Sequence, residues 1–321
     1  ANEKVEGSTP FARSKRIFLN YITSFFQNFI KNRDIRSFKK KKFYFLLFRI
    51  LRKFFNQDLI VNIYDFKVYA SYKKNNTSHA LLRKCDFDDQ TELSILKNVS
   101  KNNDIFLLDC GSNYGFYSLF VASLNSNNQI ISIEASKTTS QLLKKNIELN
   151  SFKNISLYNN ALSDTDDEAV IFNESENDWE SSISHKSFKL SNQVKVFTKK
   201  IDSIIKAEKT TENQILFIKL DIEGNEFKAL KGAYNVIQKF EPIIIIEFSR
   251  FIFNLKDSKL FLINFLKEFG YKIYNNQKEN IHEDKVFNLI ENLDINHDTI
   301  GNYYLVKKNS KNLNYFLKSY E

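Results

Sequence analysis

The sequence predicts an α/β protein built on a doubly wound, mostly parallel sheet. From about residue 57, short apolar segments with strand character alternate with longer amphipathic segments, and no internal repeat is evident. Residues 105–115, IFLLDCGSNYG, combine an apolar strand with a glycine-containing turn, with which such sheets hold nucleotide-like ligands at their carboxyl edge. A second apolar strand ends in Glu134, where a carboxylate is expected to meet ribose hydroxyls. We therefore expect one domain at 57–321, preceded by a basic, aromatic-rich helical region at 1–56.

The N-terminal region carries apolar residues at helical spacing and a concentrated positive charge. The chain has a formal net charge of +9, and lysines and arginines cluster between Arg36 and Lys53. Apolar side chains recur from Phe18 to Phe29, so residues 14–56 predict two amphipathic helices. These helices either pack on the main domain, or on a second copy of it in a homodimer, or rest on an anionic membrane surface. Nucleic acid is a less suitable partner, because the aromatic residues lie in a helical apolar stripe.

The downstream pattern predicts the elements of the sheet in order. Residues 59–71 predict a β-hairpin that turns at Asp65, and residues 88–98 predict a helix. Further strands are predicted at 105–110, 130–134, 155–161, 194–198, 215–221, 243–248, 271–274 and 302–307, and further helices at 117–124, 138–149, 225–239 and 257–269. The acidic, serine-rich stretch 163–190 is expected to be irregular, and the last two strands are candidates for an antiparallel edge.

The first strand and its turn indicate which ligand binds there. A dinucleotide would place its pyrophosphate beside this turn, where the Asp109 carboxylate repels it, whereas S-adenosylmethionine presents an ammonium and a sulfonium. The residues therefore favour S-adenosylmethionine over NAD. Glu134 suits both cofactors and so supports the fold more than it selects the ligand. The candidate cofactor-binding residues are Asp109, Gly111, Asn113, Gly115 and Glu134.

Residues 215–233, ILFIKLDIEGNEFKALKGA, place several charges around the end of a central strand. Side chains two apart share a face of a strand, so Lys219, Asp221 and, if the strand persists, Glu223 are expected to line up at the carboxyl edge. Glu226 falls in the first turn of the next helix, where it is a candidate cap.

The next apolar strand ends near Glu247, and sequential strands usually lie side by side. Charges buried at a strand end are costly unless they are paired or functional. Lys219, Asp221, Glu223 and Glu247 are therefore the candidate catalytic residues.

Five segments, in order, resemble the FkbM-type S-adenosylmethionine-dependent methyltransferases. DCGSNYG matches their D-x-G-x-N-x-G turn, IISIEAS their ribose-binding strand end, and KLDIEGNEFKALKGA their K-x-D-x-E-G-x-E…L-x-G-A signature. NNALSD at 159–164 matches their third strand and adenine-side loop, which adds Asn160 and Ala161 to the candidate cofactor residues, and KKIDS at 199–203 resembles the segment before their fourth strand. The resemblance covers roughly residues 90–310. It implies a Rossmann-like class I methyltransferase fold.

The resemblance further implies methyl transfer to a hydroxyl of a sugar, glycan or secondary metabolite, or of a lipid-linked glycan if residues 14–56 rest on a membrane. Either Asp221 or Glu223 would take the acceptor's proton, with Lys219 steadying the developing oxyanion, or Asp221 and Glu247 would hold a divalent metal ion that acidifies the hydroxyl. We favour the metal-free route, because oxygen ligands alone do not indicate a metal. His185, in the loop before the fourth strand, is an alternative base.

Two other enzyme classes are weighed against this function. A NAD-dependent or nucleotide-sugar-modifying enzyme should carry G-x-G-x-x-G, which the sequence lacks. A nucleic-acid methyltransferase would suit the positive charge, but the only prolines are Pro10 and Pro242, so the Asn/Asp-Pro-Pro-aromatic loop that resembles base methylases is missing.

The cysteines and the hydropathy pattern predict the compartment. Cys85 and Cys110 follow no metal-ligand spacing and indicate a reducing environment rather than a disulfide scaffold. No stretch predicts a signal peptide or a bilayer-spanning helix. We therefore expect a cytoplasmic protein, with the inner face of the membrane as its alternative location.

Overall fold

The computed structural model describes residues 21, 59–70, 89–174, 192–208, 214–253, 257–294 and 299–319. The chain divides into two compact units, Ala1–Asp88 and Asp89–Glu321. The predicted hairpin therefore lies on the N-terminal side of this division, whereas the boundary expected from the sequence lies at 56/57. That assignment of domains stays a prediction. Apart from Tyr21, which is helical, residues 14–56 and the two helices expected there lie outside the described residues.

The described part of the first unit is the expected hairpin. Strands β1 (Leu59–Ile63) and β2 (Phe66–Ala70) pair antiparallel, with Ile63 opposite Phe66. The turn between them contains Tyr64, which has a positive φ of 47°, and Asp65.

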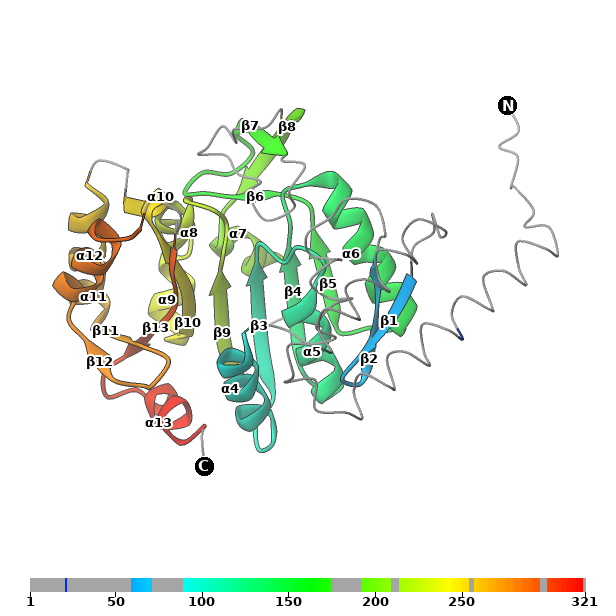
Figure 1. Ribbon diagram of the computed structural model, residues 1–321, viewed down its shortest axis with the longest axis horizontal. Coiled ribbons are helices and arrows are strands. Elements are labelled where there is room, and N and C mark those ends of the chain that lie inside the picture. The colour runs from blue at the N-terminus through cyan, green and yellow to red at the C-terminus, as the bar shows by residue number, and fades with distance from the viewer. Residues whose placement is uncertain are drawn as a thin grey trace, which may run out of the picture. The chain divides into compact units, whose positions relative to one another are not determined.

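The second unit contains an eight-stranded sheet with the order β12-β11-β13-β10-β9-β3-β4-β5 (Figure 1). Five neighbouring strands are parallel and form its centre: β10 (Ile243–Ser249), β9 (Ile215–Leu220), β3 (Ile105–Cys110), β4 (Gln129–Ile133) and β5 (Ile155–Tyr158). The edge is antiparallel and consists of β13 (Thr299–Lys307), β11 (Tyr271–Tyr274) and β12 (Asn280–Ile281). The expected doubly wound, mostly parallel sheet is confirmed.

Helices cover both faces of this sheet (Figure 1). One face carries α4 (Gln90–Ser100), α5 (Phe116–Leu124), α6 (Lys137–Asn150) and α13 (Lys311–Lys318). On the other face lie α7 (Ile201–Ala207), α8 (Glu226–Lys231), α9 (Tyr234–Phe240), α11 (Ser258–Phe269) and α12 (Glu283–Glu291), and the short α10 (Arg250–Phe253) follows β10.

The alternation of side chains along the central strands separates core from site. The even-numbered residues of β3, β9 and β10, such as Leu108 and Ile218, belong to the large core under α7, α8, α9, α11 and α12. The odd-numbered residues Asp109, Lys219 and Glu247 therefore point to the face that carries α4 and α5. Leu220, the next residue after Lys219, belongs to the core on the other face.

Three elements differ from the sequence-based expectation. The predicted strand 155–161 ends at Tyr158, and β6 (Ala161–Leu162) instead pairs parallel with β8 (Asn192–Lys199). The stretch expected to be irregular contains β7 (Ala169–Glu174), which pairs antiparallel with β8. These strands form a separate three-stranded sheet with the order β6-β8-β7. Residues 175–190 of the expected loop, which include His185, lie outside the described residues.

The third difference is that the predicted helix 225–239 is two helices, α8 and α9. Gly232, between them, lies so close to another segment that a Cβ atom there would come within 2.2 Å of the Ser163 carbonyl oxygen. The Asp202 carboxylate accepts hydrogen bonds from the backbone N–H groups of Asn235 (3.1 Å) and Val236 (2.9 Å), in the first turn of α9. A new helix therefore begins where a continuous one was expected. No helix in the described ranges is long and apolar enough to cross a bilayer.

Candidate active site

The turn between β3 and α5 depends on three residues with positive φ. Gly111, Asn113 and Gly115 have φ angles of 79°, 49° and 85°. A Cβ atom on Gly115 would lie 2.2 Å from Leu143 Cδ1 of α6, and one on Gly111 would lie 1.8 Å from the Asp221 carbonyl oxygen. The glycines are therefore required by close packing as well as by backbone conformation. The second contact brings the turn directly against the end of β9.

Asp109 lies beneath this turn and is 1% exposed. Its Oδ2 atom accepts hydrogen bonds from the backbone N–H and the hydroxyl of Ser118, at 3.1 and 2.5 Å. Burial raises the pKa of Asp109, and the opposite charge of Lys219, its register neighbour on β9, counteracts this effect.

Three buried polar atoms of the turn have no hydrogen-bond partner among the described residues: Asp109 Oδ1, Ser112 Oγ and Asn113 Oδ1. Buried acceptors without a partner are costly, so a ligand that donates hydrogen bonds would stabilise this turn. The residues present therefore fit a polar cofactor.

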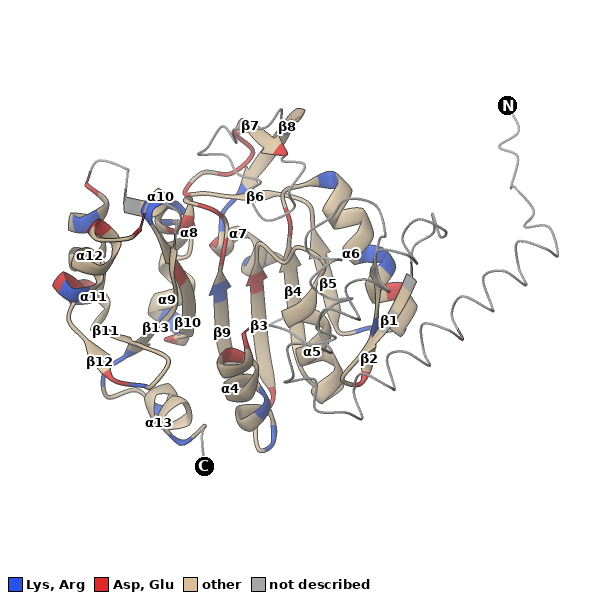
Figure 2. Ribbon diagram, viewed as in Figure 1, with Lys and Arg blue, Asp and Glu red and all other residues tan. Residues whose placement is uncertain are grey.

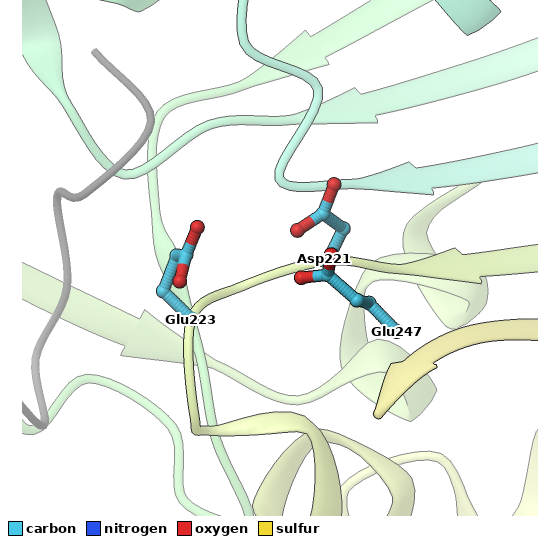
Figure 3. Close-up of side chains that lie close together, drawn as sticks. All are labelled: Asp221, Glu223 and Glu247. Atoms are coloured by element: carbon cyan, nitrogen blue, oxygen red, sulfur yellow. The ribbon is translucent and has the colours of Figure 1, made fainter. Parts of the chain in front are cut away.

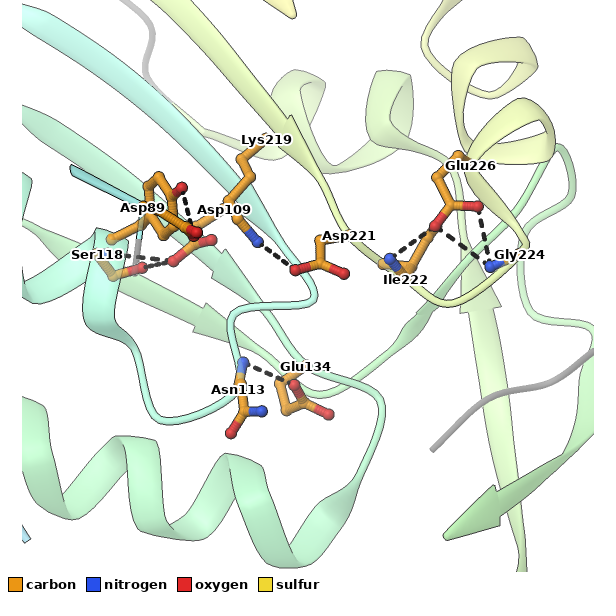
Figure 4. Close-up of polar contacts among 11 residues, drawn as sticks. Asp89, Asp109, Asn113, Ser118, Glu134, Lys219, Asp221, Ile222, Gly224 and Glu226 are labelled. Carbon is orange, nitrogen blue, oxygen red and sulfur yellow. Dashed lines mark hydrogen bonds and ion pairs between the residues drawn. The ribbon is translucent and has the colours of Figure 1, made fainter. Parts of the chain in front are cut away.

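Glu134 ends β4 and connects the turn to α6. Its carboxylate accepts a hydrogen bond from the backbone N–H of Asn113 at 2.9 Å (Figure 4). A second hydrogen bond, also 2.9 Å, comes from the backbone N–H of Ser136. Burial raises the pKa of Glu134 to about 7, although both hydrogen bonds favour the charged form. Each oxygen retains a lone pair, so ribose hydroxyls remain possible partners.

The loop after β5 holds the remaining predicted cofactor residues. Asn160 donates from Nδ2 to the Phe197 carbonyl (3.2 Å), and Ala161 is buried in β6. Asn159, the first residue of the NNALSD segment, donates to the carbonyls of Glu134 (2.7 Å) and Ala135 (3.0 Å). It thus fixes the backbone around Glu134, and the Asn-Asn pair directly after a strand is the signal that could have identified it.

Lys219 and Asp221 form an ion pair at the end of β9, with 2.8 Å between Lys219 Nζ and Asp221 Oδ2. The lysine is 4% exposed, whereas the aspartate side chain is 37% exposed. Burial alone would lower the pKa of Lys219, but the carboxylates of Asp221 and Asp109 raise it above its usual value. Figure 2 shows the basic end of β9 directly beside the acidic end of β3.

Glu223 reaches the site by a turn rather than by a longer strand. Strand β9 ends at Leu220, and Glu223 has a φ of 56°, so the condition that the strand persists is not met. The buried Glu226 carboxylate accepts hydrogen bonds from the backbone N–H groups of Ile222 (2.9 Å) and Gly224 (3.0 Å) (Figure 4). Glu226 was expected to cap its own helix. It instead stabilises the loop that precedes this helix.

Asp221, Glu223 and Glu247 converge at the carboxyl ends of β9 and β10 (Figure 3). One carboxylate oxygen from each lies within 4.8 Å of the others, and all three residues are half-buried. Burial, followed by the negative charge of Asp221, raises the pKa of Glu247 to about 8. The structure therefore brings together all four residues that the sequence assigned to catalysis.

Two further residues at this site were missed by the sequence-based reasoning. The Tyr117 ring of α5 lies under the Lys219 ammonium, 4.8 Å from Nζ to the ring centroid. Its hydroxyl donates to Asp89 Oδ2 at 2.8 Å, at the N-terminus of α4. Neither is marked by a motif of its own, because the contact joins three elements that are distant in sequence.

Comparison with known proteins identifies the family. Residues 109–273, slightly more than half of the chain, match the family described as the methyltransferase FkbM domain. The chain belongs to the FkbM methyltransferase domain family. The matched range begins at Asp109 and includes every predicted site residue, and the resemblance expected from the motifs is confirmed. The sheet, with its antiparallel strand β13 inserted between β10 and β11, is that of the class I S-adenosylmethionine-dependent methyltransferases.

Solved structures similar to this FkbM-family protein are distant in sequence. Methyltransferase FkbM from Methylobacillus flagellatus KT is 19% identical with a TM-score of 0.38, over 71% of this chain and 53% of that one. This chain therefore spans about half the length of that protein. M. jannaschii TYW2 in complex with AdoMet is 10% identical (TM-score 0.37, 78% and 85% covered). A SAM-dependent O-methyltransferase from Thermotoga maritima is 8% identical (0.35, 70% and 68%). No curated protein matches the sequence significantly.

Proposed function

We propose that this FkbM-family protein transfers a methyl group from S-adenosylmethionine to a hydroxyl of a sugar, glycan or glycolipid. The contact between Gly111 and the Asp221 carbonyl carries the proposal, because it joins the cofactor turn to the cluster of catalytic candidates. A donor held by the turn would present its methyl group beside Asp221, where an acceptor hydroxyl can also be held.

The chain's own residues would bind the donor and handle a proton. S-adenosylmethionine supplies a methyl group already activated by a sulfonium. Asp109, Asn113 and Glu134 offer acceptors for its ammonium and ribose hydroxyls, and the glycines allow close approach. Asp221, which is the partly exposed member of the ion pair, accepts the proton of the acceptor hydroxyl as its oxygen attacks. Lys219 then acts as the charge partner of Asp221, since its burial favours this role over direct contact with the acceptor oxygen.

A second route, in which a divalent metal ion acidifies the hydroxyl, is supported by the convergence of three carboxylates. Asp221, Glu223 and Glu247 offer oxygen ligands close together, as hard cations require. Lys219 already occupies one oxygen of Asp221, and we therefore favour the metal-free route. Activity lost in a chelator and restored by magnesium or manganese would reverse that preference.

Cofactor choice is tested by calorimetry with S-adenosylhomocysteine and NAD on the same preparation. We expect S-adenosylhomocysteine to bind and NAD not to bind, because Asp109 is suited to a cation and not to pyrophosphate. Binding of NAD alone would refute the proposal. The acceptor class is tested with methyl-labelled S-adenosylmethionine and fractionated cell extract, where label should enter carbohydrate or glycolipid fractions rather than nucleic acid.

The place of action is proposed to be the cytoplasm, at the inner membrane face if the acceptor is a lipid-linked glycan. The basic residues at 39–42 support this location, because each Lys or Arg near an anionic surface contributes about 1 kcal/mol. Co-sedimentation of the full chain with anionic and neutral vesicles should show binding to the anionic ones that weakens with salt. If the same amount of protein sediments with and without vesicles, the result would instead favour packing of this region on protein.

A further inference from the structure

Lys219 carries a buried ammonium that interacts, by contact or through charge, with residues of four parts of the fold. Within the described residues it pairs with Asp221 on its own strand β9, and it feels the charges of Asp109 on β3 and Asp89 at the start of α4. The Tyr117 ring of α5 lies against the same ammonium, with 4.8 Å between Lys219 Nζ and the ring centroid.

The proposed function gives Asp221 two tasks that conflict. When the acceptor oxygen bonds to the methyl carbon, the carbon–sulfur bond breaks, its electron pair remains on sulfur, and the hydroxyl proton passes to Asp221. Asp221 is then neutral, and its ion pair with Lys219 is lost. A buried ammonium without another partner would lose its proton or leave its position.

We propose that Tyr117, tied to Asp89, is a positioning residue that holds the Lys219 ammonium independently of Asp221. The reason why Lys219 needs this second support rests on the proposed function, but the contact between Tyr117 and Lys219 does not. A cation within about 6 Å of an aromatic ring face is attracted to it, most strongly where water is excluded. Tyr117 is 7% exposed, so this contact is well shielded.

The hydroxyl of Tyr117 strengthens this contact by a hydrogen bond with Asp89. It donates to Asp89 Oδ2 at 2.8 Å, which ties the ring to a third carboxylate, after Asp221 and Asp109, that acts on the ammonium. Burial keeps the pKa of Tyr117 well above its usual value, so the hydroxyl remains a donor. Lys219 can therefore stay charged and in place through a reaction cycle in which Asp221 changes its charge.

The decisive experiment observes Lys219 directly by NMR on the isotope-labelled full chain, with its side-chain resonances assigned by Lys219→Met. The Asp221→Asn variant mimics the neutral aspartate. We expect the Lys219 CεH₂ resonance to show the upfield shift of a proton over a ring in both the wild type and Asp221→Asn. If Asp221→Asn abolishes that shift, Asp221 is the sole anchor and the proposal is wrong.

Variants of the ring complete the test. Tyr117→Leu should abolish the upfield shift, whereas Tyr117→Phe should retain most of it. Tyr271→Phe is the matched control, because Tyr271 is also buried and donates a 2.9 Å hydrogen bond to the Pro242 carbonyl at the opposite end of the sheet. It should leave the Lys219 resonance unchanged, and a shift that persists in Tyr117→Leu would overturn the proposal.

Two controls keep the outcomes separate. S-adenosylhomocysteine binding, measured on each variant by calorimetry, shows that the fold is intact and tests the proposed function, whatever the lysine spectrum shows. If Tyr117→Leu does not fold, the comparison of the wild type with Asp221→Asn still decides. Asp221 is partly exposed, so its substitution by an amide of the same size should leave the core unchanged.

Discussion

At the scale of single residues, this site is governed by how buried charges are balanced. Lys219 is nearly inaccessible yet remains charged, because carboxylates surround it and an aromatic face supports it. Asp221 differs in being partly exposed, so in the proposed reaction it is the member of the pair that would exchange a proton with an acceptor. If that proposal is correct, substitutions should separate the residues that bind from those that react.

Replacing Asp221 with Asn should separate binding from chemistry. The amide keeps the size of the side chain but cannot take a proton, so turnover should fall by ~10²-fold or more. The affinity for S-adenosylhomocysteine should change little. Steady-state kinetics with labelled donor, together with calorimetry, measure both quantities. Unchanged turnover would remove Asp221 from the mechanism and direct attention to Glu223.

Replacing Gly111 with Ala should damage the turn between β3 and α5, where we propose that the donor binds. An alanine in the left-handed region costs about 1–2 kcal/mol wherever it is placed. At Gly111 its Cβ would also approach the Asp221 carbonyl oxygen to 1.8 Å, which forces the turn and β9 apart. We expect loss of S-adenosylhomocysteine binding and a lower free energy of unfolding.

Gly270→Ala provides the control for this substitution. Gly270 has a similar φ of 70°, but nothing lies within 4 Å of a Cβ atom there. This variant should lose only the stability that an alanine in the left-handed region costs, and it should bind S-adenosylhomocysteine normally. Equal effects at the two positions would mean that the contact with β9 is unimportant.

At the scale of secondary-structure elements, side chains that cap and tether the backbone decide where elements begin. Glu226 holds the loop before α8, and Asp202 on α7 caps the first turn of α9. Both are carboxylates that accept backbone N–H groups otherwise left without a partner at a helix start. They convert an apparently continuous helical pattern into a turn and two helices.

Asp202→Ala should therefore weaken the α7–α9 contact without touching the site. Removing a capping carboxylate typically costs about 0.5–2 kcal/mol, and chemical denaturation should show a loss in that range. Asp202→Asn, which keeps an accepting oxygen, should lose less. S-adenosylhomocysteine affinity should be the same in both variants, and a loss of binding would indicate that α9 positions the site.

At the scale of the whole molecule, the raised pKa values of three glutamates link stability to pH. The folded-state pKa is about 7 for Glu134 and Glu226 and about 8 for Glu247, above the ordinary value of 4.5. The folded protein therefore binds these protons more tightly than the unfolded chain does. This contribution to stability is fully present below about pH 4.5 and is lost as the pH rises through 7 to 8.

We expect this effect to appear as a difference between the wild type and Glu226→Gln. The variant cannot ionise at this position, so its melting temperature should fall less between pH 5 and 8 than that of the wild type. The comparison cancels the titration of groups that both proteins share. If the melting temperatures of the two proteins fell by the same amount between pH 5 and 8, the raised pKa of Glu226 would be contradicted.

Local patterns predicted a large part of the fold and site. Strand β3 occupies the residues expected for it, and α4, α5, α6, β9, β10 and α11 lie within two residues of their predicted ends. Asp109, Lys219 and Asp221 were identified because an apolar strand that ends in charged residues is unusual. In contrast, α7, α10, α12, α13 and β12 were not predicted, because short segments carry too little periodicity.

The sequence by itself determined the family, the sheet and the set of acidic residues at its carboxyl edge. Each of these follows from alternation along a strand or from a glycine turn, which act over a few residues. Only the tertiary structure decided that Glu223 joins the site through a left-handed turn, that β6 leaves the main sheet, and that Tyr117 supports Lys219. These features arise where elements distant in sequence pack together, and no local pattern encodes the approach of one element to another.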